Sequence, residues 1–173
     1  MKNKVCILAS LILLASVATS PARAQTTNYQ AYALFVYSIA KYSSWPSAGA
    51  EFKIQVLGNS KAYDEMQKGL AGKSIGGSIV KVEKIDNPAA KATDANIIYI
   101  SDGKSSELQE MLSATTDMPV MIITEREGLH KKGAGISFVI IDNKLRFDIN
   151  TESLEKRHVK LSTQISKLAN EIL

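Results

Sequence analysis

The side chains that could carry acid–base or metal chemistry are few, and the two histidines come first among them. His130 and His158 both stand in runs rich in lysine and arginine. Glu127 precedes His130 at a spacing that puts both side chains on one face of a helix, where they would offer two metal ligands. A zinc site needs at least one further ligand, so this pair is interpreted first as a solvated helix end. His158 is interpreted first as part of a charged turn, and we expect no bound metal.

Residues for covalent catalysis or nucleotide binding are also lacking in the sequence. The only cysteine, Cys6, lies in the apolar N-terminal run, so the rest of the chain offers neither a thiol nor a disulfide. The turn at Gly58 has one glycine where a dinucleotide-binding loop needs three. The stretch Gly72-Lys73-Ser74 lacks the earlier glycine of a P-loop. We therefore expect a protein that is not an enzyme and needs no cofactor.

Binding is the remaining class of function, and the carboxyl ends of the predicted strands are its natural place. In open α/β sheets, ligands collect beyond those ends. The polar residues that follow three predicted strands are Asn59 and Ser60, Ser101 and Asp102, and Thr124 and Glu125. Such residues also serve as caps and turns whose side chains bond the local backbone, so both interpretations stay open.

The only tryptophan and one polar strand supply further candidate contacts. Trp45 follows an aromatic-rich helical segment, and we expect it either to plug the core or to anchor a partner. Arg146, Asp148 and Asn150 project to one side of their predicted strand because strand side chains alternate. Paired charges on a solvent-exposed face would explain the same series.

The elements that must position these residues alternate between helices and strands. Apolar periodicity and turn signals predict helices over 30–42, 60–70 and 105–112, and strands over 52–57, 78–82, 97–100 and 120–123. Residues 136–141 and 145–149 flank Asp142-Asn143, a pair that tolerates positive φ, and predict an antiparallel hairpin.

The last segment is predicted to be helical and docked. Thr151 is expected to cap a short helix, and Ser162 to cap a final one. The apolar residues that recur at helical spacing after Ser162 are Ile165, Leu168, Ala169 and Ile172. The whole order predicts an α/β fold, a single domain with an open mixed sheet flanked by helices in Rossmann-like or flavodoxin-like layering, with a C-terminal β-hairpin and closing helix.

The first residues predict export. Lys2 and Lys4 precede an apolar run over 5–17, and Ala22-Arg23-Ala24 fits a cleavage site before Gln25. The run is shorter than the roughly twenty residues of a membrane span, although an uncleaved anchor stays open as the alternative. We expect a cleaved signal peptide over 1–24, one domain over 25–173, a periplasmic location, and no stable membrane insertion after cleavage.

The charge balance argues against nucleic acid as a partner. The formal charge of +4 comes from 21 basic and 17 acidic residues, and without Lys2, Lys4 and Arg23 the remaining 18 basic residues leave +1. Nucleic-acid binding requires a basic stripe interleaved with aromatic residues, and the sequence has none.

Three segments carry a resemblance to a known family. The first runs from Tyr32 through Tyr42 into Trp45-Pro46, the second is Ile54 to Gly58, and the third is 133–168, which contains Arg146-Phe147-Asp148-Ile149-Asn150. In this order and spacing the chain resembles the YfiR-like family of exported bacterial regulatory proteins over nearly all of its length beyond the leader.

The resemblance implies a repressor that binds the extracytoplasmic part of a membrane signalling enzyme, either a diguanylate cyclase or a sensor kinase. If the enzyme is a diguanylate cyclase, the protein acts in cyclic di-GMP signalling. The residues expected to contact a partner or ligand are Trp45, Asn59, Arg146, Asn150, Arg157, His158 and Lys160. The first helix is apolar on several faces, which also fits a homodimer. The alternative function is a periplasmic small-molecule-binding protein.

Overall fold

The computed structural model describes residues 28–46, 49–58, 60–88 and 94–173. The predicted signal peptide, its cleavage site and Asn59 lie outside these residues. No helix among the described residues is long and apolar enough to cross a membrane.

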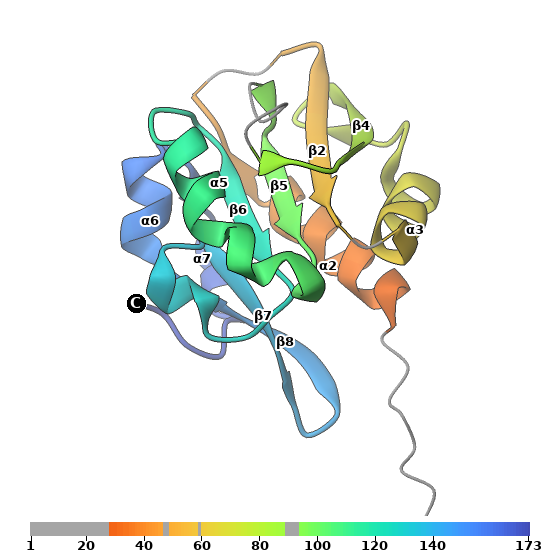
Figure 1. Ribbon diagram of the computed structural model, residues 1–173. Coiled ribbons are helices and arrows are strands. Elements are labelled where there is room, and N and C mark those ends of the chain that lie inside the picture. The colour runs from red at the N-terminus through yellow and green to blue at the C-terminus, as the bar shows by residue number, and fades with distance from the viewer. Residues whose placement is uncertain (1–27, 47–48, 59, 89–93) are drawn as a thin grey trace, which may run out of the picture.

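A seven-stranded mixed sheet forms the centre of the molecule (Figure 1). Its strands are β2 (Glu51–Leu57), β3 (Ser74–Ile75), β4 (Ser78–Ile85), β5 (Ile97–Ile100), β6 (Met121–Thr124), β7 (Ile136–Ile141) and β8 (Lys144–Ile149). They lie in the order β3-β4-β2-β5-β6-β7-β8. The five strands from β4 to β7 are parallel, and β3 and β8 are antiparallel edges. The parallel part has the flavodoxin-like order, which confirms the predicted fold class.

Helices cover both faces of the sheet because its central strands are apolar on both sides. The helical elements are α2 (Tyr29–Lys41), α3 (Ser60–Leu70), η2 (Asp102–Glu107), α5 (Leu108–Ala114), η3 (Leu129–Lys132), α6 (Thr151–Lys156) and α7 (Thr163–Ser166). In Figure 1, α2 and α3 lie behind the sheet and α5 lies in front of it. β5 and β6 are buried at every position, as the continuous apolar runs predict.

The two faces have separate cores. Val36 and Ile39 of α2 and Met66 of α3 pack with Ile54 and Tyr99 of the sheet. On the other face, Leu108 and Met111 of α5 pack with Ile98, Ile100 and Ile122. The alternation of side chains along β5 therefore contributes one residue to each core in turn.

The predicted hairpin is confirmed. β7 pairs with β8 from Ile136 opposite Ile149 to Ile141 opposite Lys144. Asp142 and Asn143 connect them with φ values of 50° and 59°, which are the positive angles of a two-residue turn. Figure 1 shows the hairpin reaching beyond the rest of the molecule.

The C-terminal segment differs from the prediction in two ways. The helix expected after Thr151 is capped by Asn150, whose side chain accepts a hydrogen bond from the backbone N–H of Ser153 at 2.8 Å. Ser162 does cap the last helix, but that helix ends at Ser166. Ile172 instead pairs with Ile149 of β8, because the free edge of β8 offers backbone bonds that a longer helix would lose.

Three short strands were absent from the prediction, and one predicted helix has another form. β1 (Ser43–Ser44) and β9 (Lys160–Leu161) make a separate two-stranded ribbon, and β3 adds an edge to β4. The helix expected over 105–112 begins earlier as the 3₁₀ segment η2 and becomes α-helical only in α5.

Candidate functional site

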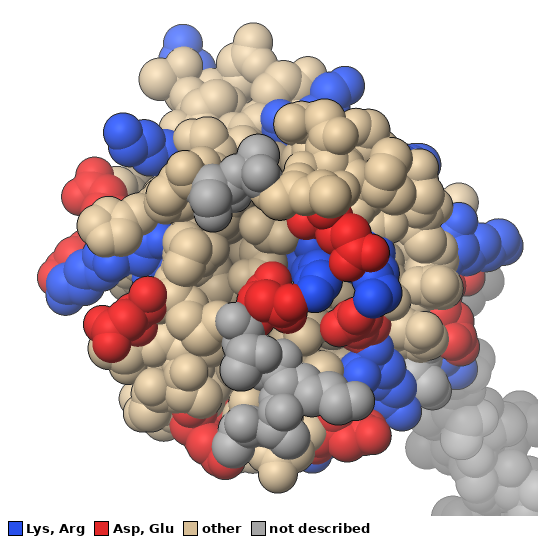
Figure 2. Space-filling view, turned by 90° about the horizontal axis from the view of Figure 1, so that it is seen from above, with Lys and Arg blue, Asp and Glu red and all other residues tan. Residues whose placement is uncertain are grey.

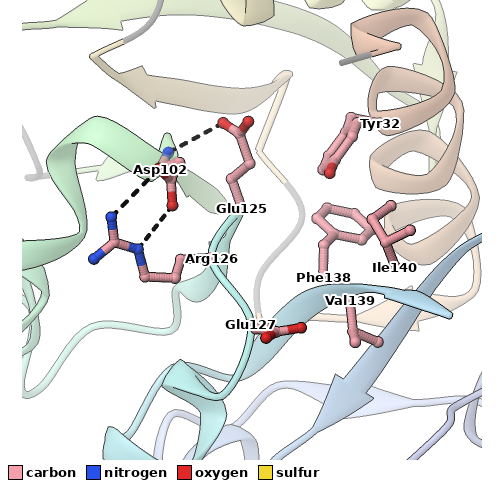
Figure 3. A pocket seen from close by; sticks show the side chains of 8 residues that line it. All are labelled: Tyr32, Asp102, Glu125, Arg126, Glu127, Phe138, Val139 and Ile140. Carbon is pink, nitrogen blue, oxygen red and sulfur yellow. Dashed lines mark hydrogen bonds and ion pairs between the residues drawn. The ribbon is translucent and has the colours of Figure 1, made fainter. Parts of the chain in front are cut away.

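A hollow of about 600 Å³ opens near the carboxyl ends of β5 and β6 and beside β7. The residues that line it are Tyr32, Asp102, Glu125, Arg126, Glu127, Phe138, Val139 and Ile140. Figure 3 shows the charged side chains on one side of the hollow and the aromatic and aliphatic ones on the other. The position agrees with the general rule for ligand sites in open α/β sheets.

Asp102 and Arg126 form a two-pronged ion pair at the charged side. Arg126 Nε donates to Asp102 Oδ1 at 2.7 Å, and Nη2 donates to Oδ2 at 3.3 Å. The guanidinium lowers the pKa of Asp102, and the carboxylate raises the pKa of Arg126. Because both side chains are more than half exposed, the pair adds little stability but holds two charges at the rim of the hollow.

Glu125 is the half-buried acid of the site. Burial raises its pKa, and this rise is opposed by the backbone N–H of Asp102, which donates to Glu125 Oε2 at 3.1 Å. Burial followed by the nearby charge of Glu125 raises the pKa of Tyr32 to about 12. The same two causes raise the pKa of the buried Tyr99 phenol well above its usual range. Glu125 is thus a carboxyl group held among phenols, where a donor or a cation would be favoured over an anion.

The apolar side of the hollow belongs to α2 and β7. The rings of Tyr32 and Phe138 meet edge to face with their centroids 4.9 Å apart. Beyond them, Ile140 is 46% exposed. Three carboxylates and one guanidinium therefore face an aromatic and aliphatic wall, and the eight lining residues include no serine, cysteine or histidine. This arrangement suits binding of a cationic or donor group attached to an apolar one.

The structure brings together one residue from each of the two later strand-end pairs, and ligand binding by them stays a prediction. Asp102 and Glu125 meet through the hydrogen bond at 3.1 Å, as parallel neighbours β5 and β6 require. Thr124 is buried and shares a 2.9 Å hydrogen bond with Ser137 Oγ, so its side chain is used inside the protein. Tyr32 and Phe138 were not predicted as site residues, because their apolar spacing is that of ordinary core positions.

Trp45 lies at the amino-terminal ends of β2 and β5, the end of the parallel strands opposite the hollow. Its ring packs edge to face on Phe52 with centroids 4.9 Å apart, and its Nε1 donates to the backbone carbonyl of Asn96 at 3.1 Å. These contacts give the ring a packing role. Figure 2 views the molecule from this end of the strands. It shows acidic and basic side chains interleaved, without a continuous patch of either sign.

Asn150 and Arg157 have structural contacts. Besides capping α6, Asn150 donates from Nδ2 to the His130 carbonyl at 2.7 Å. Arg157 is buried, and burial lowers its pKa. Its guanidinium donates to the carbonyl of Thr115, to Thr115 Oγ1 at 2.9 Å and to the carbonyl of Leu112 at 3.3 Å. It therefore satisfies the carboxyl end of α5.

The remaining predicted site residues are exposed. Arg146 lies on β8 opposite Val139. His158, with φ of 56°, and Lys160 line a second hollow of about 460 Å³ over α6 and β9. The structure thus brings His158 and Lys160 together and leaves Trp45 and Arg146 in other places. A partner or ligand contact by any of these residues stays a prediction.

The interpretation of His130 as a solvated helix end is wrong. His130 is only 1% exposed, whereas Glu127 lines the hollow described above. The error arose because a basic run predicts a solvent-exposed surface, while the turn at η3 directs this one side chain inward.

Comparison with known proteins supports the fold and indicates a family. A family model described as YfiR/HmsC-like matches residues 29–170. Among solved structures, an ABC domain from Streptococcus pneumonia in complex with L-Trp is 10% identical with a TM-score of 0.58, over 84% of this chain and 60% of that one. A conserved domain protein from Vibrio cholerae is 11% identical with a TM-score of 0.58, over 85% and 60% of the two chains. At such identities the two structures show a shared fold alone.

Proposed function

Because this chain belongs to the YfiR/HmsC-like family, we propose that it is an exported regulatory protein without catalytic activity, which controls a membrane signalling enzyme by direct contact. The enzyme is a diguanylate cyclase, and the chain functions in the periplasm after its signal peptide over 1–24 is removed. The part over 25–173 is the regulatory domain.

The projecting β7–β8 hairpin is the observation that best supports this proposal (Figure 1). β8 is the last strand of the sheet, so its outer edge between Lys144 and Arg146 can accept another chain. Ile140 and Arg146 are exposed on the hairpin. They project to opposite faces, because Ile140 pairs with Leu145 and Arg146 with Val139, so each face of the hairpin offers one exposed side chain to a partner.

The hairpin adjoins the hollow described above. Phe138, Val139 and Ile140 belong to β7 and also line the hollow with Glu125. A partner segment that lies along β7 on the side of the hollow would therefore reach the carboxylates with a lysine or arginine. The contact surface proposed here consists of the hairpin tip, residues 139–146, and the acidic hollow.

Control would follow from a shift between two states of the enzyme. A repressor that binds the inactive state more tightly than the active state moves the equilibrium by its difference in affinity. A tenfold preference changes the ratio of the two states tenfold, which corresponds to about 1.4 kcal/mol. The chain itself need not change shape for this mechanism.

The test is inhibition of the cyclase in membrane vesicles from the source cell by the purified protein. The Ile140→Asp variant places a charge on the hairpin and is expected to weaken inhibition by about tenfold or more. Ile79→Asp is the matched control, since Ile79 is a strand isoleucine of similar exposure, 53% against 46%, near the other end of the sheet. Equal inhibition by both variants, or none by the unaltered protein, would contradict the proposal.

A second candidate function is binding of a small molecule in the acidic hollow. The observation in its favour is the half-buried Glu125 facing the Tyr32 and Phe138 rings. A ligand with an amine and an apolar part fits this arrangement. A panel of such amines that raises the melting temperature of the protein, but not that of Glu125→Gln, would support this function, and a protein that inhibits the cyclase without any ligand would favour the first.

A further inference from the structure

A buried histidine, His130, lies at the base of the β7–β8 hairpin. His130 is 1% exposed, and its Nδ1 and Nε2 both lack a hydrogen bond within the part of the chain that the structure describes. Nδ1 lies 3.8 Å from Asp148 Oδ2, and Nε2 lies 3.3 Å from Glu171 Oε2, but neither contact has hydrogen-bond geometry. Buried polar atoms without a partner are uncommon because their desolvation is not compensated.

The backbone around His130 holds the ring in place. Its N–H donates to Ser137 Oγ at 2.6 Å, and its carbonyl accepts from Asn150 Nδ2 at 2.7 Å. Gly128 and Gly133, with φ values of 75° and 105°, start and end the short η3 turn that carries the ring. These backbone contacts fix the η3 turn, and the turn directs the His130 ring into the protein.

Hydrogen bonds and an ion pair also position the two carboxylates, Asp148 and Glu171. Asp148 is 5% exposed, and its Oδ1 accepts from Asn170 Nδ2 at 2.8 Å, which leaves Oδ2 toward the imidazole. Glu171 is held by its backbone carbonyl, which accepts from the Ile149 N–H at 2.9 Å. Lys131 Nζ lies 3.0 Å from Glu171 Oε1 and so leaves Oε2 for the histidine side.

We propose that His130, Asp148 and Glu171 bind a divalent cation of the zinc class, with water as a further ligand. One nitrogen or oxygen atom from each of the three residues lies within 4.8 Å of the others. Ligand bonds of 2.0–2.2 Å in tetrahedral geometry place neighbouring ligand atoms about 3.3 Å apart. The distance between His130 Nε2 and Glu171 Oε2 already has this value, whereas Asp148 Oδ2, which lies 3.8 Å from Nδ1 of the same ring, must move closer to join them.

Charge and access agree with a cation at this position. Two carboxylates face one imidazole in a place where Asp148 is nearly excluded from water. A divalent cation would compensate both negative charges, and one imidazole with two carboxylates is a donor set suited to zinc. The Glu171 side chain is 38% exposed, which leaves an entry path and room for the water ligand. The hydrogen bonds to Asn170 and to the His130 backbone are the supporting contacts that metal ligands require.

The site would fasten the C-terminal segment to the sheet. Glu171 is next to Ile172, which bridges to Ile149, while His130 precedes β7 and Asp148 lies on β8. A bound cation joins these three segments at the base of the hairpin. This inference does not depend on the regulatory function proposed above.

The first measurement is zinc binding to the purified protein, expressed from its full sequence and stripped with chelator. We expect one zinc ion per chain by titration calorimetry and elemental analysis. The melting temperature should rise by roughly 5 °C at a zinc concentration about a hundred times the dissociation constant. Failure to bind zinc, or binding without a change in melting temperature, would overturn the proposal.

Conservative variants locate the ion. Glu171→Gln and Asp148→Asn keep the shape and one acceptor oxygen but remove the negative charge, so they should fold, and each should reduce zinc affinity at least tenfold. His158→Gln is the matched control, because His158 is the exposed histidine of the described chain. Loss of zinc binding in His158→Gln with full binding in Glu171→Gln would place the ion elsewhere and overturn the assignment.

Discussion

Arg157 and His130 are both buried basic side chains from charged runs of the sequence, yet their surroundings are opposite. Arg157 is 7% exposed and donates to carbonyls and a hydroxyl at the end of α5. His130 is 1% exposed, and no hydrogen bond to its ring is found among the described residues. A buried group whose bonds are satisfied holds the fold together, whereas one left unsatisfied is a candidate for binding.

The largest effect is expected for Arg157→Met. The variant removes the buried guanidinium's hydrogen bonds to the carbonyls of Thr115 and Leu112 and to Thr115 Oγ1, and we expect it to lower the free energy of unfolding by about 3 kcal/mol. Urea denaturation measures this value. Lys156→Met is the control from the exposed neighbouring position and should stay within about 0.5 kcal/mol of the unaltered protein. A loss of less than 1 kcal/mol in Arg157→Met would mean that its bonds are not structural.

Asn150→Ala is expected to have the next largest effect. It removes the cap of α6 and the donor to the His130 carbonyl together, and should lower the free energy of unfolding by about 2 kcal/mol. Asn150→Asp keeps the capping oxygen but loses the donor, so the difference between Asn150→Asp and the unaltered protein isolates the support of the η3 turn. If Asn150→Asp bound zinc as tightly as the unaltered protein, that turn would not position the ligand.

His130→Leu tests the contrast with Arg157 directly. Because the ring makes no hydrogen bond that would be lost, the change in unfolding free energy with chelator present should be at most about 1 kcal/mol. With zinc present the unaltered protein alone should gain stability. A cost as large as that of Arg157→Met in chelator would show that the imidazole is a structural group.

Glu125→Gln gives the smallest effect, and its sign depends on pH. Below the ordinary pKa of glutamate, about 4.3, the carboxyl is neutral in both states and contributes nothing. As the pH rises, the unfolded state ionises first because burial raises the pKa in the folded protein, so the folded state loses stability. The variant should therefore be more stable at pH 7 by less than about 1 kcal/mol, with the gain fading toward pH 4. Urea denaturation across this pH range measures the trend, and Glu127→Gln, the same substitution at an exposed position, is the control.

Local patterns predicted the regular elements well. The strand expected over 97–100 is β5 from Ile97 to Ile100, and the Asp142-Asn143 turn has the positive φ values that its residue types allow. The β1–β9 ribbon was missed because two-residue strands have no periodicity to detect. The helical spacing up to Ile172 misled because pairing with Ile149 decided the conformation of the last residues.

The sequence by itself determined the α/β order, the hairpin and the family resemblance, since these depend on neighbouring residues and their spacing. Only the tertiary structure decided that His130 is buried between Asp148 and Glu171 and that Arg157 serves α5. Desolvation and the choice of partners depend on segments that are distant along the chain. Two basic residues in similar runs can therefore have opposite roles once the sheet brings different neighbours to them.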